Sequence, residues 1–258
     1  MKYLPNLLTL ANLFCGCTAI AFILNAQPFW GDFQNGNYWA VFGTEQMYLG
    51  SIFIAIAAVC DLLDGAVARG LKIFSTIGKD LDSLADLVSF GVAPSMILFK
   101  LLWAAYMSEE NALDVNMLAM APAFLFACFG ALRLARFNIS APQKGGFTGM
   151  PIPAAGIFVA TLPLIAWYNP YGLGVYLQNK WLVYLIIIVL SGLMVSRIPF
   201  IKLMPAKWKL AYTWPQLVIV IVTLAALPFL KIAAIPLAFI VYILLSLVYR
   251  RPAEEQAA

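Results

Sequence analysis

Five aspartates lie between residues 61 and 86, and four of them are candidate site residues in a stretch of chain that is otherwise mostly apolar: Asp61, Asp64, Asp82 and Asp86. A carboxylate in an apolar environment is costly, and several neighbouring carboxylates also repel one another. Protonation or bound cations relieve this repulsion, and divalent metal is the simplest solution. Carboxylate oxygens are hard ligands that suit Mg²⁺ or Mn²⁺. The sequence therefore predicts that these four residues form a metal site.

The residues around the first aspartate pair share one face of a predicted helix. They occur at i, i+3, i+4, i+7 and i+8: Asp61, Asp64, Gly65, Ala68 and Arg69. The two small residues allow close approach of a ligand or another backbone, and the guanidinium suits a phosphate at the mouth of the site. Helix packing is the alternative explanation for the small residues.

The second pair lies on one face of the next predicted helix, with Gly78, Asp82 and Asp86 at i, i+4 and i+8. The connector over residues 70–77 is short, which predicts that the two helices are antiparallel neighbours. At about 1.5 Å per residue, Asp61 and Asp86 each lie roughly 12 Å from this connector. Equal depth places these two carboxylates opposite each other.

The helices that carry these residues belong to a membrane protein. Of the 258 residues, 63% are hydrophobic and 11% are charged, whereas soluble domains are about 45–50% apolar and about 25% charged. One span takes about 20 apolar helical residues. We therefore expect an all-α polytopic membrane protein with one membrane-embedded domain over residues 1–258.

The apolar segments of this domain predict about eight transmembrane helices: 5–26, 47–69, 78–104, 117–136, 151–168, 181–197, 214–230 and 232–250. The last two form either a tight hairpin or one broken element.

Lys and Arg are unevenly distributed between the predicted loops. With the N-terminus in the cytoplasm, thirteen of the 16 lie on the cytoplasmic side, and the loops at 27–46 and 105–116 contain none. Cytoplasmic loops of membrane proteins are enriched in Lys and Arg. The distribution predicts an aspartate site that opens to the cytoplasm, in the inner or plasma membrane of the cell. The basic residues form no stripe, so nucleic acid is not an expected partner.

The chain contains no histidine. This excludes Ser-His-Asp catalysis, zinc sites built on H-E-x-x-H, and phosphohistidine intermediates. Acid–base chemistry must therefore fall to carboxylates, Lys, Tyr or Cys. The four cysteines lie in apolar stretches, and we interpret them as reduced, buried residues.

The run from Asp61 to Asp86 resembles the signature of the CDP-alcohol phosphotransferase family, D-x-x-D-G-x-x-A-R-(x)8-G-x-x-x-D-x-x-x-D, at every fixed position. This resemblance implies that Asp61, Asp64 and Asp82 bind two divalent metal ions and that Asp86 completes the site and is the general base. It also implies a homodimer. The cytidine and phosphates of a CDP-linked substrate would be bound by Asp61, Gly65, Ala68, Arg69 and Gly78.

Further stretches resemble the membrane-integral phosphatidylserine synthases of that family: LPNLLTLANLFCG at 4–16, DLVSFGVAP at 86–94, ALRLARFN at 131–138 and GMPIPAA at 149–155. The resemblance implies transfer of the phosphatidyl group from CDP-diacylglycerol to the hydroxyl of L-serine, with release of CMP. The near alternative is the same chemistry on glycerol 3-phosphate or inositol phosphate. A divalent cation transporter is a remote alternative, since no acidic residue occurs between Asp114 and Glu254 to form a second, related site.

Three polar residues are candidates for serine binding. Arg133 and Arg136 end the fourth predicted span and share a helical face, and a guanidinium suits the serine carboxylate. Asn138 is a further candidate. Anchoring of the span at the cytoplasmic surface, or contact with lipid headgroups, is the alternative role for both arginines.

Polar residues also recur every third position along the first predicted span, at Asn6, Thr9 and Asn12. They either line the nucleotide pocket or join helices by hydrogen bonds. For Asn12 we favour helix packing, and for the other two both roles stay open.

Overall fold

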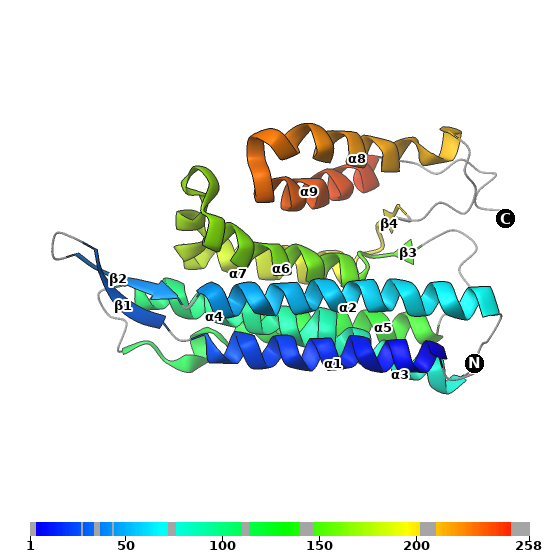
Figure 1. The fold of residues 1–258 in the computed structure, drawn as a ribbon, viewed down its shortest axis with the longest axis horizontal. Coiled ribbons are helices and arrows are strands. Elements are labelled where there is room, and N and C mark those ends of the chain that lie inside the picture. Colours follow the sequence, from blue (N-terminus) through cyan, green and yellow to red (C-terminus); the bar gives the residue numbers. More distant parts are fainter. Residues whose placement is uncertain are drawn as a thin grey trace.

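Long apolar helices run side by side through most of the molecule (Figure 1). The computed structural model describes residues 4–26, 28–33, 37–42, 44–71, 76–109, 114–139, 147–201 and 210–248. Its α-helices in this part of the chain are α1 Leu4–Asn25, α2 Thr44–Leu71, α3 Thr76–Asp86, α4 Ala93–Met107, α5 Leu125–Ile139, α6 Ile152–Tyr168, α7 Lys180–Val195, α8 Leu210–Leu230 and α9 Ala234–Val248.

Within the described ranges, five helical stretches are long and apolar enough to cross a membrane: Leu4–Asn25, Gln46–Leu71, Ile77–Met107, Met117–Ile139 and Thr213–Val248. A sixth is formed by α6 with the 3₁₀ segment η5, Pro170–Gln178, which is bent by 115° from it, and α7 is a shorter apolar helix. The last stretch reverses direction at Lys231, where φ is +50°, and α8 and α9 lie side by side as a hairpin (Figure 1). When α8 and α9 are counted separately and α7 is included, these helices correspond to the eight predicted segments.

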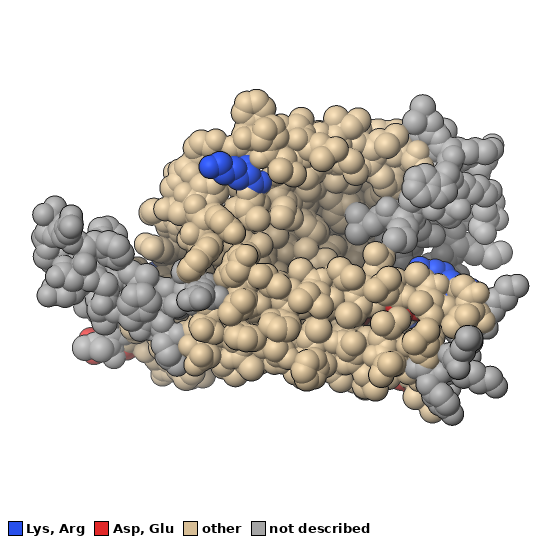
Figure 2. Space-filling view, viewed as in Figure 1, with Lys and Arg blue, Asp and Glu red and all other residues tan. Residues whose placement is uncertain are grey.

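The outer surface is apolar. Figure 2 shows one face on which Asp, Glu, Lys and Arg are few and most atoms belong to other residues. Large apolar side chains such as Leu7, Phe14, Ile188, Ile221 and Phe229 are more than half exposed. In water such a surface would drive association, whereas lipid covers it without penalty. The protein is therefore a multi-pass membrane protein.

A π-helical turn joins α3 to α4. The turn, η1, spans Leu87–Val92, and the N–H of Ala93 bonds to the carbonyl of Val88. Two glycines allow neighbouring helices to approach it. A Cβ at Gly16 of α1 would lie 2.3 Å from Oγ of Ser89, and a Cβ at Gly156 of α6 would lie 2.7 Å from the carbonyl oxygen of Phe90. Any larger residue would push these helices away from the turn that directly follows Asp86.

Two short antiparallel strand pairs were not predicted from the sequence. In the first, β1 Pro28–Phe33 pairs with β2 Asn37–Phe42 between α1 and α2. In the second, β3 Phe147–Thr148 pairs with β4 Pro199–Phe200. Both lie outside the candidate membrane spans, so the all-α architecture of the membrane region is confirmed.

The β3–β4 pair connects three helices. The N–H of Gly149, which has a φ of +82°, donates to the carbonyl of Ile198, so the start of α6 is fixed to the end of α7. The next residue after β4, Ile201, bonds to α9 through both backbone groups: its N–H donates to Ser246, and its carbonyl accepts from the Tyr242 hydroxyl. The C-terminal hairpin is therefore attached to the rest of the bundle by specific polar contacts.

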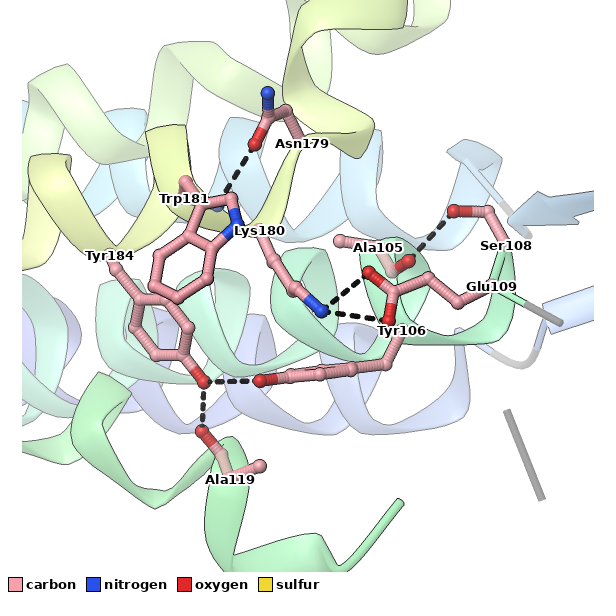
Figure 3. A network of polar contacts seen from close by, with 9 residues as sticks. All are labelled: Ala105, Tyr106, Ser108, Glu109, Ala119, Asn179, Lys180, Trp181 and Tyr184. Carbon is pink, nitrogen blue, oxygen red and sulfur yellow. Dashed lines mark hydrogen bonds and ion pairs between the residues drawn. The ribbon is translucent and has the colours of Figure 1, made fainter. Parts of the chain in front are cut away.

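A polar network joins α4 to α7 at the end of α4 that is farther from the aspartates (Figure 3). The ammonium of Lys180 lies 2.6 Å from Oε1 of Glu109 and 4.8 Å from the ring centre of Tyr106. The Tyr184 hydroxyl lies 2.9 Å from that of Tyr106 and donates to the carbonyl of Ala119. These contacts lie about 30 Å along the helix from Asp86, at about 1.5 Å per residue.

Candidate active site

Three carboxylates from two helices converge. One carboxylate oxygen from each of Asp61, Asp64 and Asp82 lies within 4.8 Å of the others. Among the described residues, Oδ1 of Asp82 is buried and has no hydrogen-bond partner. Buried acceptors are rarely left unpaired, and converging hard oxygen donors are the ligands that Mg²⁺ and Mn²⁺ use. The residues present therefore fit a divalent metal site.

Asp86 lies beside this group, at the end of α3. Its carboxyl group lies near that of Asp61, as the equal depth of the two residues predicts. It is only 8% exposed and is not one of the three residues whose oxygens converge within 4.8 Å. The arrangement gives this carboxylate a position next to the predicted metal ligands.

The first helix holds two of the four aspartates. The hydroxyl of Thr9 donates to Oδ2 of Asp64 over 2.7 Å, and Nδ2 of Asn12 lies 3.4 Å from Oδ1 of Asp86. Sequence reasoning left the role of Thr9 open and treated Asn12 as a packing residue, so it missed the second contact. The available signal was the recurrence of polar residues on one face of an apolar span.

The position of α1 also changes the predicted arrangement of helices. It packs along most of α2 and also against α3, whereas α2 and α3 make little direct backbone contact in the described part of the chain. The aspartate side chains of α2 and α3 meet, as predicted, and α1 packs against both helices, which was not predicted. The first helix runs alongside both, which explains how it supplies hydrogen bonds to each.

The remaining residues of the Asp61–Asp86 run lie toward the connector between α2 and α3. A Cβ on Gly65 would be 3.2 Å from Nη1 of Arg69, so the guanidinium lies over this glycine. Arg69 is exposed and interacts electrostatically with Asp64. Ala68 and Gly78 are half-buried. The guanidinium of Arg69 therefore lies next to the carboxylates. It fits there because Gly65 has no side chain in that space.

The two arginines of α5 have different environments. Arg133 is 9% exposed, interacts electrostatically with Asp86, and has a buried Nε without a hydrogen-bond partner among the described residues. Arg136 is exposed. Burial of a guanidinium with an unused donor is unfavourable unless an anion completes it. Of the two predicted serine-binding arginines, Arg133 is therefore the one placed near the aspartates.

Asn138 lies at the end of α5 and bonds to α3. Its Nδ2 donates to Oγ of Ser83 over 2.8 Å, and its carbonyl accepts from Nζ of Lys79 over 3.1 Å. These contacts hold α5 against α3, and the predicted contact of Asn138 with serine stays a prediction.

A sequence model of CDP-alcohol phosphatidyltransferases matches residues 2–193. The chain belongs to this family. All four aspartates, Arg69 and Arg133 lie inside the matched region, while α8 and α9 lie beyond it.

Three relatives of this CDP-alcohol phosphatidyltransferase carry the name CDP-diacylglycerol–serine O-phosphatidyltransferase. The Bacillus subtilis protein is 33% identical over 200 residues, which cover 78% of this chain and 90% of the relative. The Helicobacter pylori protein is 35% identical over 210 residues, covering 80% and 75%. The Mycobacterium tuberculosis protein is 32% identical over 255 residues, covering 94% and 77%, so the similarity to that relative extends into α8 and α9.

Proposed function

We propose that this enzyme transfers the phosphatidyl group of CDP-diacylglycerol to the hydroxyl of L-serine, forming phosphatidylserine and CMP. The observation that carries the proposal is that Asp86 lies near two kinds of group. It interacts with the aspartates whose carboxylates converge, and it also interacts with the buried guanidinium of Arg133. The names of the relatives support serine as the acceptor.

Asp61, Asp64 and Asp82 would hold two divalent ions, Mg²⁺ or Mn²⁺, which supply positive charge for the phosphoryl oxygens and for the departing CMP. Arg69, together with the space at Gly65, Ala68 and Gly78, would border the cytidine and phosphates. The position of the guanidinium over Gly65 supports this role. Arg69 is exposed and lies beside the carboxylates, where its guanidinium could bind a diphosphate.

Asp86 would act as the general base. It accepts the proton of the serine hydroxyl while the hydroxyl oxygen attacks the phosphorus that carries the diacylglycerol group. The bond from that phosphorus to CMP then breaks. A base must lie within hydrogen-bonding distance of the hydroxyl that it deprotonates. Arg133, through its unpaired buried Nε, would bind the serine carboxylate and hold the hydroxyl toward Asp86.

The reaction would take place at the cytoplasmic side of the inner or plasma membrane. The excess of Lys and Arg on the predicted cytoplasmic loops supports this orientation, and serine and the nucleotide are water-soluble groups that reach the site from that side. We also expect a homodimer, as the family resemblance implies.

The decisive experiment is a measurement of CMP release from CDP-diacylglycerol by purified protein in detergent with Mn²⁺. Serine, glycerol 3-phosphate and inositol phosphate are compared as acceptors. We expect release with serine alone, reduced about 10²–10⁴-fold in Asp86→Asn. Asp80→Asn is the matched control, because Asp80 is exposed on the same helix. Release only with a phosphorylated alcohol would reject serine while retaining the aspartate chemistry.

A further inference from the structure

Asn12 makes two hydrogen bonds to one face of the α3–η1 segment. Its Nδ2 donates to Oδ1 of Asp86, and its backbone carbonyl accepts from Oγ of Ser89 over 3.0 Å. Both Asp86 and Ser89 therefore face α1. Gly16, one turn after Asn12, lets α1 come close enough for both bonds.

The side chain of Asn12 is fully buried, and its Oδ1 has no hydrogen-bond partner among the described residues. An unpaired buried amide oxygen is unfavourable, and an apolar residue of the same size would pack between the helices without it. Packing alone therefore does not account for an amide here. What the amide of Asn12 provides, and an apolar side chain could not, is the N–H donor directed at Asp86.

We propose that Asn12 is a positioning residue for Asp86. The inference rests on the proposed function, in which Asp86 is the base. Asp86 also contacts Asp61 and has Asp82 and Asp64 within electrostatic range. A fixed donor on Oδ1 restrains rotation of the carboxyl group and sets its direction toward the acceptor hydroxyl. The hydrogen bond from Ser89 to the backbone carbonyl of Asn12 is a separate contact between α1 and η1.

The test compares Asn12→Leu with Ser89→Ala. The first removes the donor to Asp86 and keeps a side chain of similar size. The second removes the hydrogen bond from η1 to the backbone of Asn12 and leaves the donor to Asp86 in place. We expect kcat of Asn12→Leu to fall about 10²-fold, the scale expected for a misplaced reacting group. The KM values for serine and CDP-diacylglycerol and the half-maximal Mn²⁺ concentration stay within about 3-fold, and Ser89→Ala keeps kcat within about 3-fold.

A double-variant cycle separates positioning from structural damage. If Asn12 acts through Asp86, adding Asn12→Leu to Asp86→Asn lowers kcat no further, because coupled residues are not additive. Additive losses, or equal losses in Asn12→Leu and Ser89→Ala, would overturn the proposal. A change confined to the KM for CDP-diacylglycerol or to Mn²⁺ dependence would do so too, by placing Asn12 in the nucleotide or metal site.

Asn12→Ala, which cannot clash, provides the same comparison if the leucine variant does not fold. The cycle can be run with any alcohol that supports CMP release, so failure of serine as the acceptor is distinguishable from failure of the role of Asn12.

Discussion

The hydroxyl of Thr9 in α1 donates a 2.7 Å hydrogen bond to Oδ2 of Asp64 in α2, 55 residues away. Both residues are buried, at 4% and 6% exposed. A hydroxyl bound to one carboxylate oxygen fixes the orientation of the group and leaves the other oxygen for a cation. Such outer contacts determine how well a metal ligand is preorganised.

Replacing Thr9 by valine keeps the shape of the side chain and removes this donor. We expect the Mn²⁺ concentration for half-maximal CMP release to rise about 10–100-fold, the range for loss of a group that orients a metal ligand. Thr18→Val is the control, because among the described residues the Thr18 hydroxyl bonds to the carbonyl of Phe14 within the same helix and not to an aspartate. An unchanged Mn²⁺ requirement in Thr9→Val would show that Asp64 does not need the hydroxyl.

Oδ1 of Asp82 is buried beside the other aspartates and has no hydrogen-bond partner in the described part of the chain. Asp82→Asn removes one negative charge, and divalent-ion affinity depends on ligand charge. Binding of Mn²⁺ to purified protein can be measured from the electron paramagnetic resonance signal of the free ion. We expect Asp82→Asn to lose this binding and Asp80→Asn to keep it. Chelation of the metal should abolish CMP release, and added Mn²⁺ or Mg²⁺ should restore it. Retained binding in Asp82→Asn would remove this residue from the ligand set.

The two arginines of α5 provide a test of acceptor binding. Arg133→Gln removes a charge-assisted contact worth about 1.5–3 kcal/mol, so the KM for serine should rise about 10–150-fold while that for CDP-diacylglycerol stays nearly constant. Arg136→Gln, an exposed position on the same helix, should leave both within about 3-fold. Equal effects of the two substitutions on the serine KM would indicate a general electrostatic contribution from this end of α5.

The helix carrying Asp86 needs small neighbours. Gly156→Ala places a Cβ 2.7 Å from the backbone oxygen of Phe90, and overpacking of this kind costs about 1–3 kcal/mol. We expect a lower midpoint of thermal unfolding in detergent. Gly192→Ala should leave the midpoint unchanged, because nothing lies within 4 Å of its added Cβ. A stable Gly156→Ala variant would mean that α6 shifts without penalty.

The parts of the site that were predictable are those set by local spacing. Residues 61–69 and 78–86 each occupy one helical face, and face periodicity alone brings Asp61 toward Asp86. The contacts of Thr9 and Asn12 were not predictable, because their partners lie 55 and 74 residues away and depend on how α1 packs. The short connector correctly indicated that the aspartate faces of α2 and α3 meet, but it gave no information about the packing of α1 against both helices.

Two local features, the π turn and the β1–β2 pair, were not predicted, for different reasons. The π turn at Leu87–Val92 adds one residue to a helical turn without changing the apolar character of the segment, so hydropathy does not reveal it. The β1–β2 pair did have a signal. The sequence between its strands contains Asn35-Gly36, a dipeptide typical of hairpin turns.

The bonds between Ile201 and α9 have a consequence for the order of biosynthesis. Tyr242, which bonds to Ile201, also lies within electrostatic range of Arg133. Because a chain is synthesised from its N-terminus, every aspartate of the site enters the membrane before this tyrosine is made. The half that carries the aspartates can therefore assemble while the ribosome is still translating, whereas the surroundings of Arg133 are completed only after α9 has inserted.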